Sequence, residues 1–456
     1  MTQQQQSVGL LSLLQGAVLL TADCLGTGLL ALPSDLNVVL GLTWGIFILI
    51  LQLPLNLYAG TVLHKAATIV EARGDGDETT TEVENQESSK IVATSTGYKM
   101  GYDSINIVQE YEVDQQEEDH CNKDQLTFDF IGITQALFES KTAKRVVITI
   151  YYTNIFLVLG DYILVMSHAV VAMVGGNLCL PIAGLLASTL MFAVSQLRTM
   201  EKLGRTASFV SLAALLIVLL QCLAALKHID QMEIPLPQSN IFSKFSGLAA
   251  IGFAVGSQKL FLNIRHEMRH RYESPKALGY SLIFYVTAYV VICIIAGPNP
   301  PSFLFDAIAP GFSRQLGGFL LWVHVVVSYA INSQAICSSM DRLLVQPRFP
   351  QTPSGKRWMG ITLLTSVSAF LVANAIPFFS DLVALIGALT SIPLTLLLPI
   401  LLYRKATSST NIWIPDISWS YLVLVASVLF TIVGLIGAIV EIDMDWSNQG
   451  SAFSCT

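Results

Sequence analysis

Eleven runs of predominantly apolar residues recur along this 456-residue chain, most of them about 20 residues long. A helix that crosses the hydrocarbon core of a bilayer needs about 20 such residues, because the core is about 30 Å thick and each helical residue adds about 1.5 Å. Only 12% of the residues are charged, about half the share found in soluble domains, which excludes a large soluble enzyme. We therefore predict an all-α polytopic membrane protein with eleven transmembrane helices. The predicted spans lie near residues 10–32, 36–60, 147–174, 180–196, 206–226, 246–263, 278–297, 315–337, 358–376, 380–402 and 418–440.

The distribution of Lys and Arg between alternate connections predicts the orientation of these spans. If the N-terminus is cytoplasmic, 22 of the 25 basic residues lie on the cytoplasmic side, where membrane proteins concentrate them. With eleven spans, the C-terminus then lies on the extracytoplasmic side. The sequence is compatible with the plasma membrane and with a vacuolar or lysosomal membrane.

One polar segment interrupts the apolar pattern. Residues 70–125 contain 15 acidic and four basic residues, a net charge of −11, whereas the whole chain carries −7. This composition predicts a disordered cytoplasmic loop over residues 65–125, and a partner-binding segment is the alternative. The loop separates helices 1–2 (1–64) from helices 3–11 (126–441), and residues 442–456 form a short extracytoplasmic tail.

Two spans carry helix-breaking residues near their middle. Span 1 contains Gly26-Thr27-Gly28 and Pro33, and span 6 contains Gly252, Gly256 and Ser257. Glycine costs about 1 kcal/mol relative to alanine in a helix, and unwound backbone persists at membrane depth only where it faces protein or a water-filled cavity. Close helix packing would also explain each set of small residues. However, spans 1 and 6 hold the same position in two successive groups of five, which predicts an inverted repeat with a midplane substrate site.

Four segments carry recognisable motifs: GTGLLALP (26–33), FAVGSQKLFLNIRHEM (253–268), WVHVVVSYA (322–330) and IPFFSDLVALIGALTSIPLTLLLPILLYRK (376–405). Together they resemble the amino acid/auxin permease family, a branch of the amino acid, polyamine and organocation superfamily. The resemblance implies a LeuT-like 5+5 inverted repeat with discontinuous helices 1 and 6. It also implies amino acid transport coupled to a proton gradient, or sometimes to sodium.

The substrate-binding candidates lie on the two interrupted spans. We expect the carboxylate of an amino acid to meet freed amides at Gly26, Thr27 and Gly28, and its amine to meet carbonyls near Gly252, Gly256 and Ser257. Asp23 lies deep in span 1, where a carboxylate must pair, bind a cation or stay protonated. We assign it to substrate binding or ion coupling, with a structural hydrogen bond as the alternative.

Span 3 carries a polar stripe. Asn154, Asp161 and His168 are seven residues apart and therefore share one helix face. Asp and His side chains can take up and release protons, so the stripe could be a proton relay, with Asp161 as an ion-coupling residue. Hydrogen bonding between helices is the equal alternative.

Span 8 carries a second stripe, because His324, Ser328 and Asn332 fall at i, i+4 and i+8. We include these three residues among the ion-coupling candidates. Oxygen ligands such as those of Ser328 and Asn332 suit sodium, but a nearby ammonium could replace that ion, so a proton is the favoured coupling ion and sodium the alternative.

Lys259 departs from the family pattern, because many relatives have an uncharged residue at this position of the segment FAYAGHNVVLEIQ. It either points into the site or extends to the cytoplasmic interface, and the second reading is favoured. Arg265, Arg269 and Arg271 are predicted to be interfacial anchors.

The seven cysteines form no CxxC pair and mostly fit the pattern of small buried residues. A disulfide between Cys179 and Cys455, which share the outer side, is conceivable but is not the favoured reading.

The leading hypothesis is a secondary active transporter that moves amino acids by alternating access, coupled to protons, and there are two alternatives. One is an amino acid sensor that signals through the acidic loop, and the other is a transporter of auxin or a related organic acid. The expected partners are an amino acid, the lipid bilayer and a possible cytoplasmic protein at the loop, with no nucleic acid. Because the chain lacks a Gly-x-Ser-x-Gly motif, we expect no enzyme activity, cofactor or metal site.

Overall fold

The computed structural model describes residues 11–93, 130–196, 200–227, 240–256, 258–344, 355–408, 417–449 and 452–455, and in this part of the chain all regular elements are helical. The elements are α1 (Leu13–Cys24), α2 (Gly28–Ser34), the π-helix η1 (Asp35–Val39), α3 (Leu42–Ala93), α5 (Phe130–Leu137), α6 (Lys141–Met173), α7 (Leu180–Val194), α8 (Met200–Leu226), α9 (Ile241–Ala254), α10 (Gln258–Glu267), the 3₁₀-helix η2 (Arg271–Glu273), α11 (Ser274–Ala296), the 3₁₀-helix η3 (Leu304–Ala307), α12 (Phe312–Leu344), α13 (Gly355–Ala375), α14 (Phe379–Ile386), the π-helices η4 (Gly387–Ser391) and η5 (Pro393–Leu397), α15 (Leu398–Ser408) and α16 (Ile417–Gln449).

Nine helical stretches among the described residues are long and apolar enough to cross a membrane. Shorter apolar helices cover Leu13–Ala22, Gly28–Val39 and Leu180–Val194. Large apolar side chains such as Trp44, Phe284 and Leu429 are exposed on the helices, as lipid-facing residues are. The prediction of an all-α polytopic membrane protein is confirmed, whereas the eleven-span inverted repeat stays a prediction.

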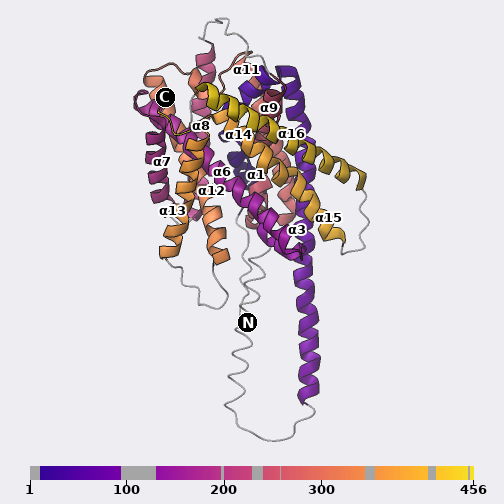
Figure 1. The fold of residues 1–456 in the computed structure, drawn as a ribbon. Coiled ribbons are helices and arrows are strands. Elements are labelled where there is room, and N and C mark those ends of the chain that lie inside the picture. The colour runs from indigo at the N-terminus through magenta and orange to yellow at the C-terminus, as the bar shows by residue number, and fades with distance from the viewer. Residues whose placement is uncertain are drawn as a thin grey trace.

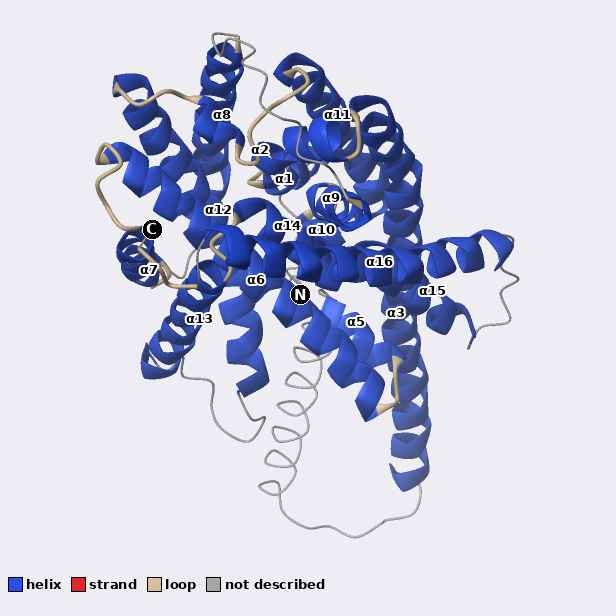
Figure 2. Ribbon diagram, turned by 45° about the horizontal axis from the view of Figure 1, so that its top comes forward, coloured by secondary structure: helices blue, strands red, loops and turns tan. Residues whose placement is uncertain are grey.

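Two predicted spans are each divided into a pair of helices. The first pair is α1 and α2, separated by Leu25, Gly26 and Thr27, and the second pair is α9 and α10, separated by residues 255–257. All four helices lie near the middle of the bundle in Figure 2, and α2 packs on α9. The helix breaks therefore meet inside the protein.

The outer helices pack around these central elements in two groups. Helix α6 packs against α12 and α13, and α12 also contacts α8. On the other side, α11 contacts α1 and α3, while α16 lies along α9. Figure 1 shows the long α3 in indigo and purple, with one end projecting beyond the bundle.

Helix α3 continues to Ala93 and includes the first part of the segment that the composition predicts to be disordered. Adding residues to an existing helix costs far less than nucleating a new one, so the apolar span can support this extension. Residues 94–129 lie outside the described part of the chain.

The segment that precedes α1 pairs with the residues that follow α10. Leu11 N donates to Glu267 O at 3.0 Å, Arg269 N donates to Leu11 O at 2.8 Å, and the two segments form an isolated parallel bridge. A Cβ atom on Gly16 of α1 would lie 3.2 Å from the Met268 Sδ atom. The start of α1 and the end of α10 are thus joined.

Arg265 was predicted to be an interfacial anchor, and that prediction is wrong. Its side chain is 4% exposed and donates to both carboxylate oxygens of Glu71 on α3, at 2.6 and 2.7 Å. Its Nε also donates to His64 Nδ1 at 3.1 Å. The rotation of α10 after the break explains the error, because it turns this position toward α3.

Cys179 and Cys455 form a disulfide, with 5.2 Å between their Cα atoms. The tail around Cys455 folds back onto α13, where Phe453 N donates to Asn374 O at 3.1 Å. The favoured reading of buried thiols was therefore wrong for this pair, because the tail and the start of α7 meet on one face. The described free cysteines, Cys24, Cys222, Cys293 and Cys337, are buried.

Replacing Cys455 by serine is expected to lower the melting temperature of the purified protein by about 5 °C, because a native cross-link typically contributes about 2–5 kcal/mol. Thermal unfolding in detergent measures this change. Reductant should lower the melting temperature of the wild type to the same value and leave the variant unchanged. Equal melting of variant and unreduced wild type would show that the cross-link adds no stability.

Candidate functional site

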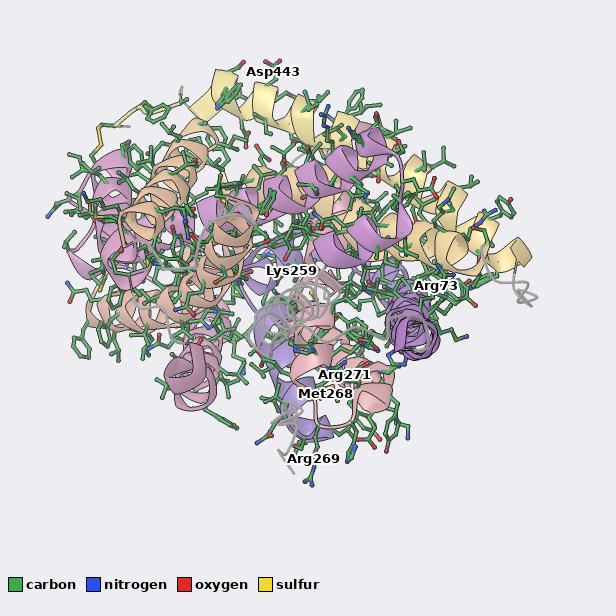
Figure 3. All side chains as sticks on the ribbon, turned by 90° about the horizontal axis from the view of Figure 1, so that it is seen from below. Arg73, Lys259, Met268, Arg269, Arg271 and Asp443 are labelled. Atoms are coloured by element: carbon green, nitrogen blue, oxygen red, sulfur yellow. A yellow bond between two sulfur atoms is a disulfide. The ribbon has the colours of Figure 1, made fainter. Side chains whose placement is uncertain are left out.

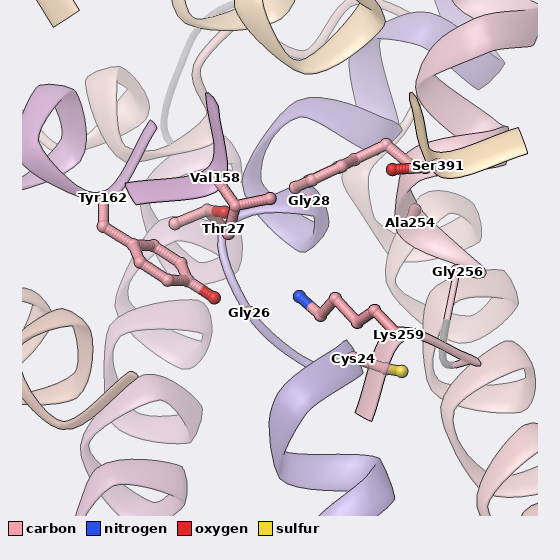
Figure 4. Close-up of a pocket in the computed structure, with 11 residues that line it drawn as sticks. Cys24, Gly26, Thr27, Gly28, Val158, Tyr162, Ala254, Gly256, Lys259 and Ser391 are labelled. Atoms are coloured by element: carbon pink, nitrogen blue, oxygen red, sulfur yellow. The ribbon is translucent and has the colours of Figure 1, made fainter. Parts of the chain in front are cut away.

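Both helix breaks border one central cavity, shown in Figure 4. Its walls come from the α1–α2 break, α6, the α9–α10 break and η4. The cavity volume is about 20 Å³, which is room for about one water molecule, so a larger ligand requires the surrounding helices to separate. The lining residues are Cys24, Gly26, Thr27, Gly28, Val158, Tyr162, Phe253, Ala254, Gly256, Lys259 and Ser391.

The first break is held by bonds at both of its ends. Leu25 N donates to Thr21 O at 2.8 Å, and on the far side Leu30 N donates to Thr27 O at 2.9 Å. Thr27 is the N-cap residue of α2, but its hydroxyl makes no capping bond. Instead, Thr27 Oγ1 donates to the Asp161 Oδ2 atom at 2.5 Å, which connects the break to α6.

The two breaks approach each other closely at Gly28. A Cβ atom on this residue would lie 3.3 Å from the ring of Phe253 and 3.4 Å from the Ala254 Cα atom. The spacing therefore depends on the absence of a side chain here, and a larger residue would require the Phe253 ring or α9 to shift.

Two buried tyrosines of α11 contact the main chain of both breaks. The Tyr289 hydroxyl donates to Cys24 O at 2.7 Å and Ala254 O at 3.2 Å. The Tyr285 hydroxyl donates to Val255 O at 3.1 Å. Neither tyrosine belongs to a sequence motif, and their spacing of four residues along an otherwise apolar span is the only sequence signal for them.

Lys259 points into the cavity, as Figure 4 shows. In the view of Figure 3 it lies toward the middle of the bundle, whereas Arg269 lies at its edge. The prediction that Lys259 extends to the interface was therefore wrong, because the break at residues 255–257 turns the first turn of α10 inward. Lys259 thus places a cationic side chain in the cavity, whereas the acidic Asp161 does not line the cavity itself but is bonded to the lining residue Thr27.

The polar stripe of α6 makes three separate contacts. Asn154 Nδ2 donates to Thr390 Oγ1 at 2.8 Å and to Ser391 Oγ at 3.1 Å. Asp161 bonds to Thr27, as described above, and His168 packs against Phe303 with 5.3 Å between ring centroids. One turn of helix advances about 5.4 Å, so stripe members seven residues apart are separated by about two turns, and each is used by a different neighbour.

Asp161 is fully buried, with 0% of its surface exposed. Its Oδ2 atom accepts from Thr27, and its Oδ1 atom has no hydrogen-bond partner among the described residues. A buried carboxylate oxygen without a partner is costly. This oxygen is therefore suited to carry a proton.

The stripe of α12 is divided between two neighbours. His324 Nδ1 lies 2.8 Å from Ser211 Oγ of α8, so this ring faces away from the cavity. Ser328 Oγ donates to His324 O at 3.2 Å within its own helix. Asn332 Nδ2 donates to Ser328 O at 3.0 Å and lies 3.5 Å from the hydroxyl of Tyr162, a cavity residue.

The other sequence candidates differ in their location. Gly26, Thr27, Gly28 and Gly256 line the cavity, but a Cβ on Gly252 would meet Ile392 and Phe430, so this glycine serves helix packing. Asp23 lies in the last turn of α1, and its side chain lies outside the described part of the structure, as does the whole of Ser257. In the described residues, no group of His, Cys, Asp and Glu is arranged to hold a metal ion.

Comparison with known families gives a match over most of the chain. A family described as "Transmembrane amino acid transporter protein" matches residues 102–440. This range includes α6 to α15, most of α16, and all of the second break.

Three curated proteins are similar over parts of their length. The N amino acid transport system protein of Neurospora crassa is 30% identical over 167 residues, which are 35% of this chain and 34% of that protein. The amino acid transporter AVT1E of Arabidopsis thaliana is 26% identical over 161 residues, 33% of this chain and 30% of that protein. A transmembrane transporter of Fusarium pseudograminearum is 23% identical over 315 residues, 61% of this chain and 63% of that protein. The chain thus spans about a third of the length of the first two relatives.

Proposed function

Because this chain belongs to the transmembrane amino acid transporter protein family, we propose that it is a secondary active transporter that moves amino acids by alternating access, with a proton as the coupling ion. The observation that carries this proposal is the meeting of two helix breaks at one central cavity. Paired discontinuous helices are the usual site of substrate and ion binding in such transporters.

The breaks supply both kinds of group that an amino acid needs. The first turn of a helix has amides without partners inside that helix and carries partial positive charge, so the stretch Gly26–Gly28 suits the substrate carboxylate. The last residues of α1 and α9, Cys24 and Ala254, present carbonyls at the negative ends of their helices. These carbonyls suit the substrate amine.

The packing of the outer helices supports the inverted repeat. In such a repeat, the helices α3, α6, α7 and α8 of the first half correspond in order to α11, α12, α13 and α14–α15 of the second half. With this correspondence, most contacts between helices have a counterpart in which each helix is replaced by its equivalent. The contact of α6 with α13 corresponds to that of α12 with α7, and the contact of α12 with α8 corresponds to that of α6 with α14. The contact of α3 with α15 likewise corresponds to that of α11 with α8.

The surroundings of Asp161 favour a proton over sodium. Its carboxyl is buried and bonded to Thr27 at the break, so a change in its charge would act directly on the α1–α2 connection. The proposed sodium ligands Ser328 and Asn332 both donate to carbonyls of α12, and Lys259 already supplies a cationic group at the cavity.

The proposal is tested by uptake of a mixture of labelled amino acids into proteoliposomes in sodium-free buffer. We expect accumulation while a proton gradient is present and loss of the accumulated label when the gradient is collapsed. Binding without accumulation would contradict transport and favour a sensor. Accumulation only after sodium is added would contradict proton coupling.

Replacing Lys259 by glutamine is expected to admit cationic amino acids. Two like charges about 6 Å apart at an effective dielectric constant of about 20 repel by about 3 kcal/mol, which corresponds to about a hundredfold in affinity. Lysine and alanine are each tested as competitors of labelled substrate, and the ratio of their apparent affinities measures the change. A general loss of activity affects both affinities equally and therefore does not alter this ratio. Lys356→Gln, at an exposed position of α13, is the matched control. An unchanged ratio in Lys259→Gln would contradict a role in selectivity.

A further inference from the structure

Helix α11 presents a row of hydroxyl groups to the two broken helices. Ser281, Tyr285 and Tyr289 are spaced four residues apart and therefore share one face. All three are buried, with exposed fractions of 1%, 0% and 0%. Ser281 Oγ accepts from Thr21 Oγ1 of α1 at 3.0 Å, and the two tyrosines bond to the breaks themselves.

The atoms that Tyr289 contacts are the last carbonyls of α1 and α9. Cys24 and Ala254 are the final residues of these helices, and both line the cavity. Carbonyls at helix C-termini lack partners inside the helix and carry partial negative charge. Two such ends repel each other unless a donor lies between them, and the Tyr289 hydroxyl fills that position at 2.7 and 3.2 Å.

Packing does not account for these hydroxyls. The rings of Tyr285 and Tyr289 lie 5.8 Å apart in an edge-on arrangement, and phenylalanine would provide the same contact. A buried hydroxyl is costly without a hydrogen bond and gains about 0.5–1.5 kcal/mol with one. The oxygen atoms are thus needed for their bonds to the main chain, which connect one helix to both breaks.

We propose that Tyr289, assisted by Tyr285, is a positioning residue that holds the carbonyl ends of α1 and α9 at the spacing that receives the amine of the substrate. This inference rests on the proposed transport of amino acids. A carbonyl oxygen can accept two hydrogen bonds, so Cys24 and Ala254 can keep Tyr289 and still accept from an ammonium group. Tyr285 acts on the second break alone, through Val255.

The test compares Tyr289→Phe, Tyr285→Phe and the control Tyr280→Phe, whose ring is 57% exposed on the same helix. The probes are the amino acid that wild-type proteoliposomes accumulate most and its desamino carboxylic acid, both measured as competitors of labelled uptake. We expect Tyr289→Phe to reduce the preference for the amino acid over the desamino acid about tenfold, Tyr285→Phe to reduce it about threefold, and Tyr280→Phe to leave it unchanged.

The preference is informative because general damage to the protein weakens both competitors equally. An unchanged preference in Tyr289→Phe and Tyr285→Phe, with wild-type transport intact, would overturn the inference. Failure of the wild type to accumulate any amino acid would instead overturn the proposed function. If Tyr289→Phe does not yield folded protein, Tyr285→Phe still decides, because its smaller effect must appear on the amino acid alone.

Discussion

Asp161→Asn is expected to abolish the accumulation of amino acids against their gradient while leaving their exchange across the membrane measurable. Asparagine has nearly the same shape and can still accept from Thr27 Oγ1, which lies 2.5 Å from the carboxylate. It cannot gain or lose a proton, so the link between proton movement and the α1–α2 break is lost. The ratio of internal to external substrate should fall from its driven value to about 1, because uncoupled carriers only equilibrate their substrate.

Two assays on the same proteoliposomes measure this effect: accumulation under an imposed proton gradient, and exchange with unlabelled substrate inside. Asp443→Asn is the matched control, since Asp443 is exposed near the end of α16 and lies at the rim of the bundle in Figure 3. Wild-type accumulation by Asp161→Asn would show that another group carries the proton. Loss of both accumulation and exchange would indicate that the carboxylate is needed for substrate binding or folding.

Gly28→Val is expected to reduce transport at least about a hundredfold without preventing insertion into the membrane. The first carbon of the new side chain would lie 3.3 Å from the ring of Phe253 and 3.4 Å from the Ala254 Cα atom. Two further methyl groups would enter a cavity of about 20 Å³. Overpacking of this kind typically costs about 1–3 kcal/mol, and here the added atoms occupy the proposed path of the substrate.

The control for this substitution is Gly360→Val on α13, where a Cβ atom meets nothing within 4 Å. This variant should transport as the wild type does and should appear in the membrane in similar amounts. Direct binding of labelled amino acid to purified protein separates a blocked site from slow movement. Normal binding and uptake by Gly28→Val would exclude the contact between the two breaks as part of the substrate site.

The spans and their breaks could be predicted from sequence because they depend on local properties. A long apolar run is needed wherever the chain crosses the bilayer, and glycine weakens a helix whatever surrounds it. The breaks at Gly26–Gly28 and Gly256 therefore appeared in the sequence, and these residues line the cavity.

The contacts that individual side chains make depend on how each helix is rotated about its axis. His324, Ser328 and Asn332 do share a face, but the sequence of α12 alone does not say that His324 meets Ser211 of α8. Lys259 and Arg265 both follow the second break, whose geometry decides that one enters the cavity and the other meets Glu71. The disulfide requires Cys179 and Cys455, 276 positions apart, to approach each other, which no local pattern records.

The backbone pairing of Leu11 with the residues after α10 has a mechanical consequence. It connects α1 and α10, which belong to different broken helices, so that they form one rigid unit at that end of the bundle. If this end opens, the two helices must swing together or first break two hydrogen bonds, so opening should occur in one concerted step. Spin labels on α1 and α10 would then report one common rate of movement away from α3. Two separate rates would show that the backbone pairing between the two helices breaks during opening.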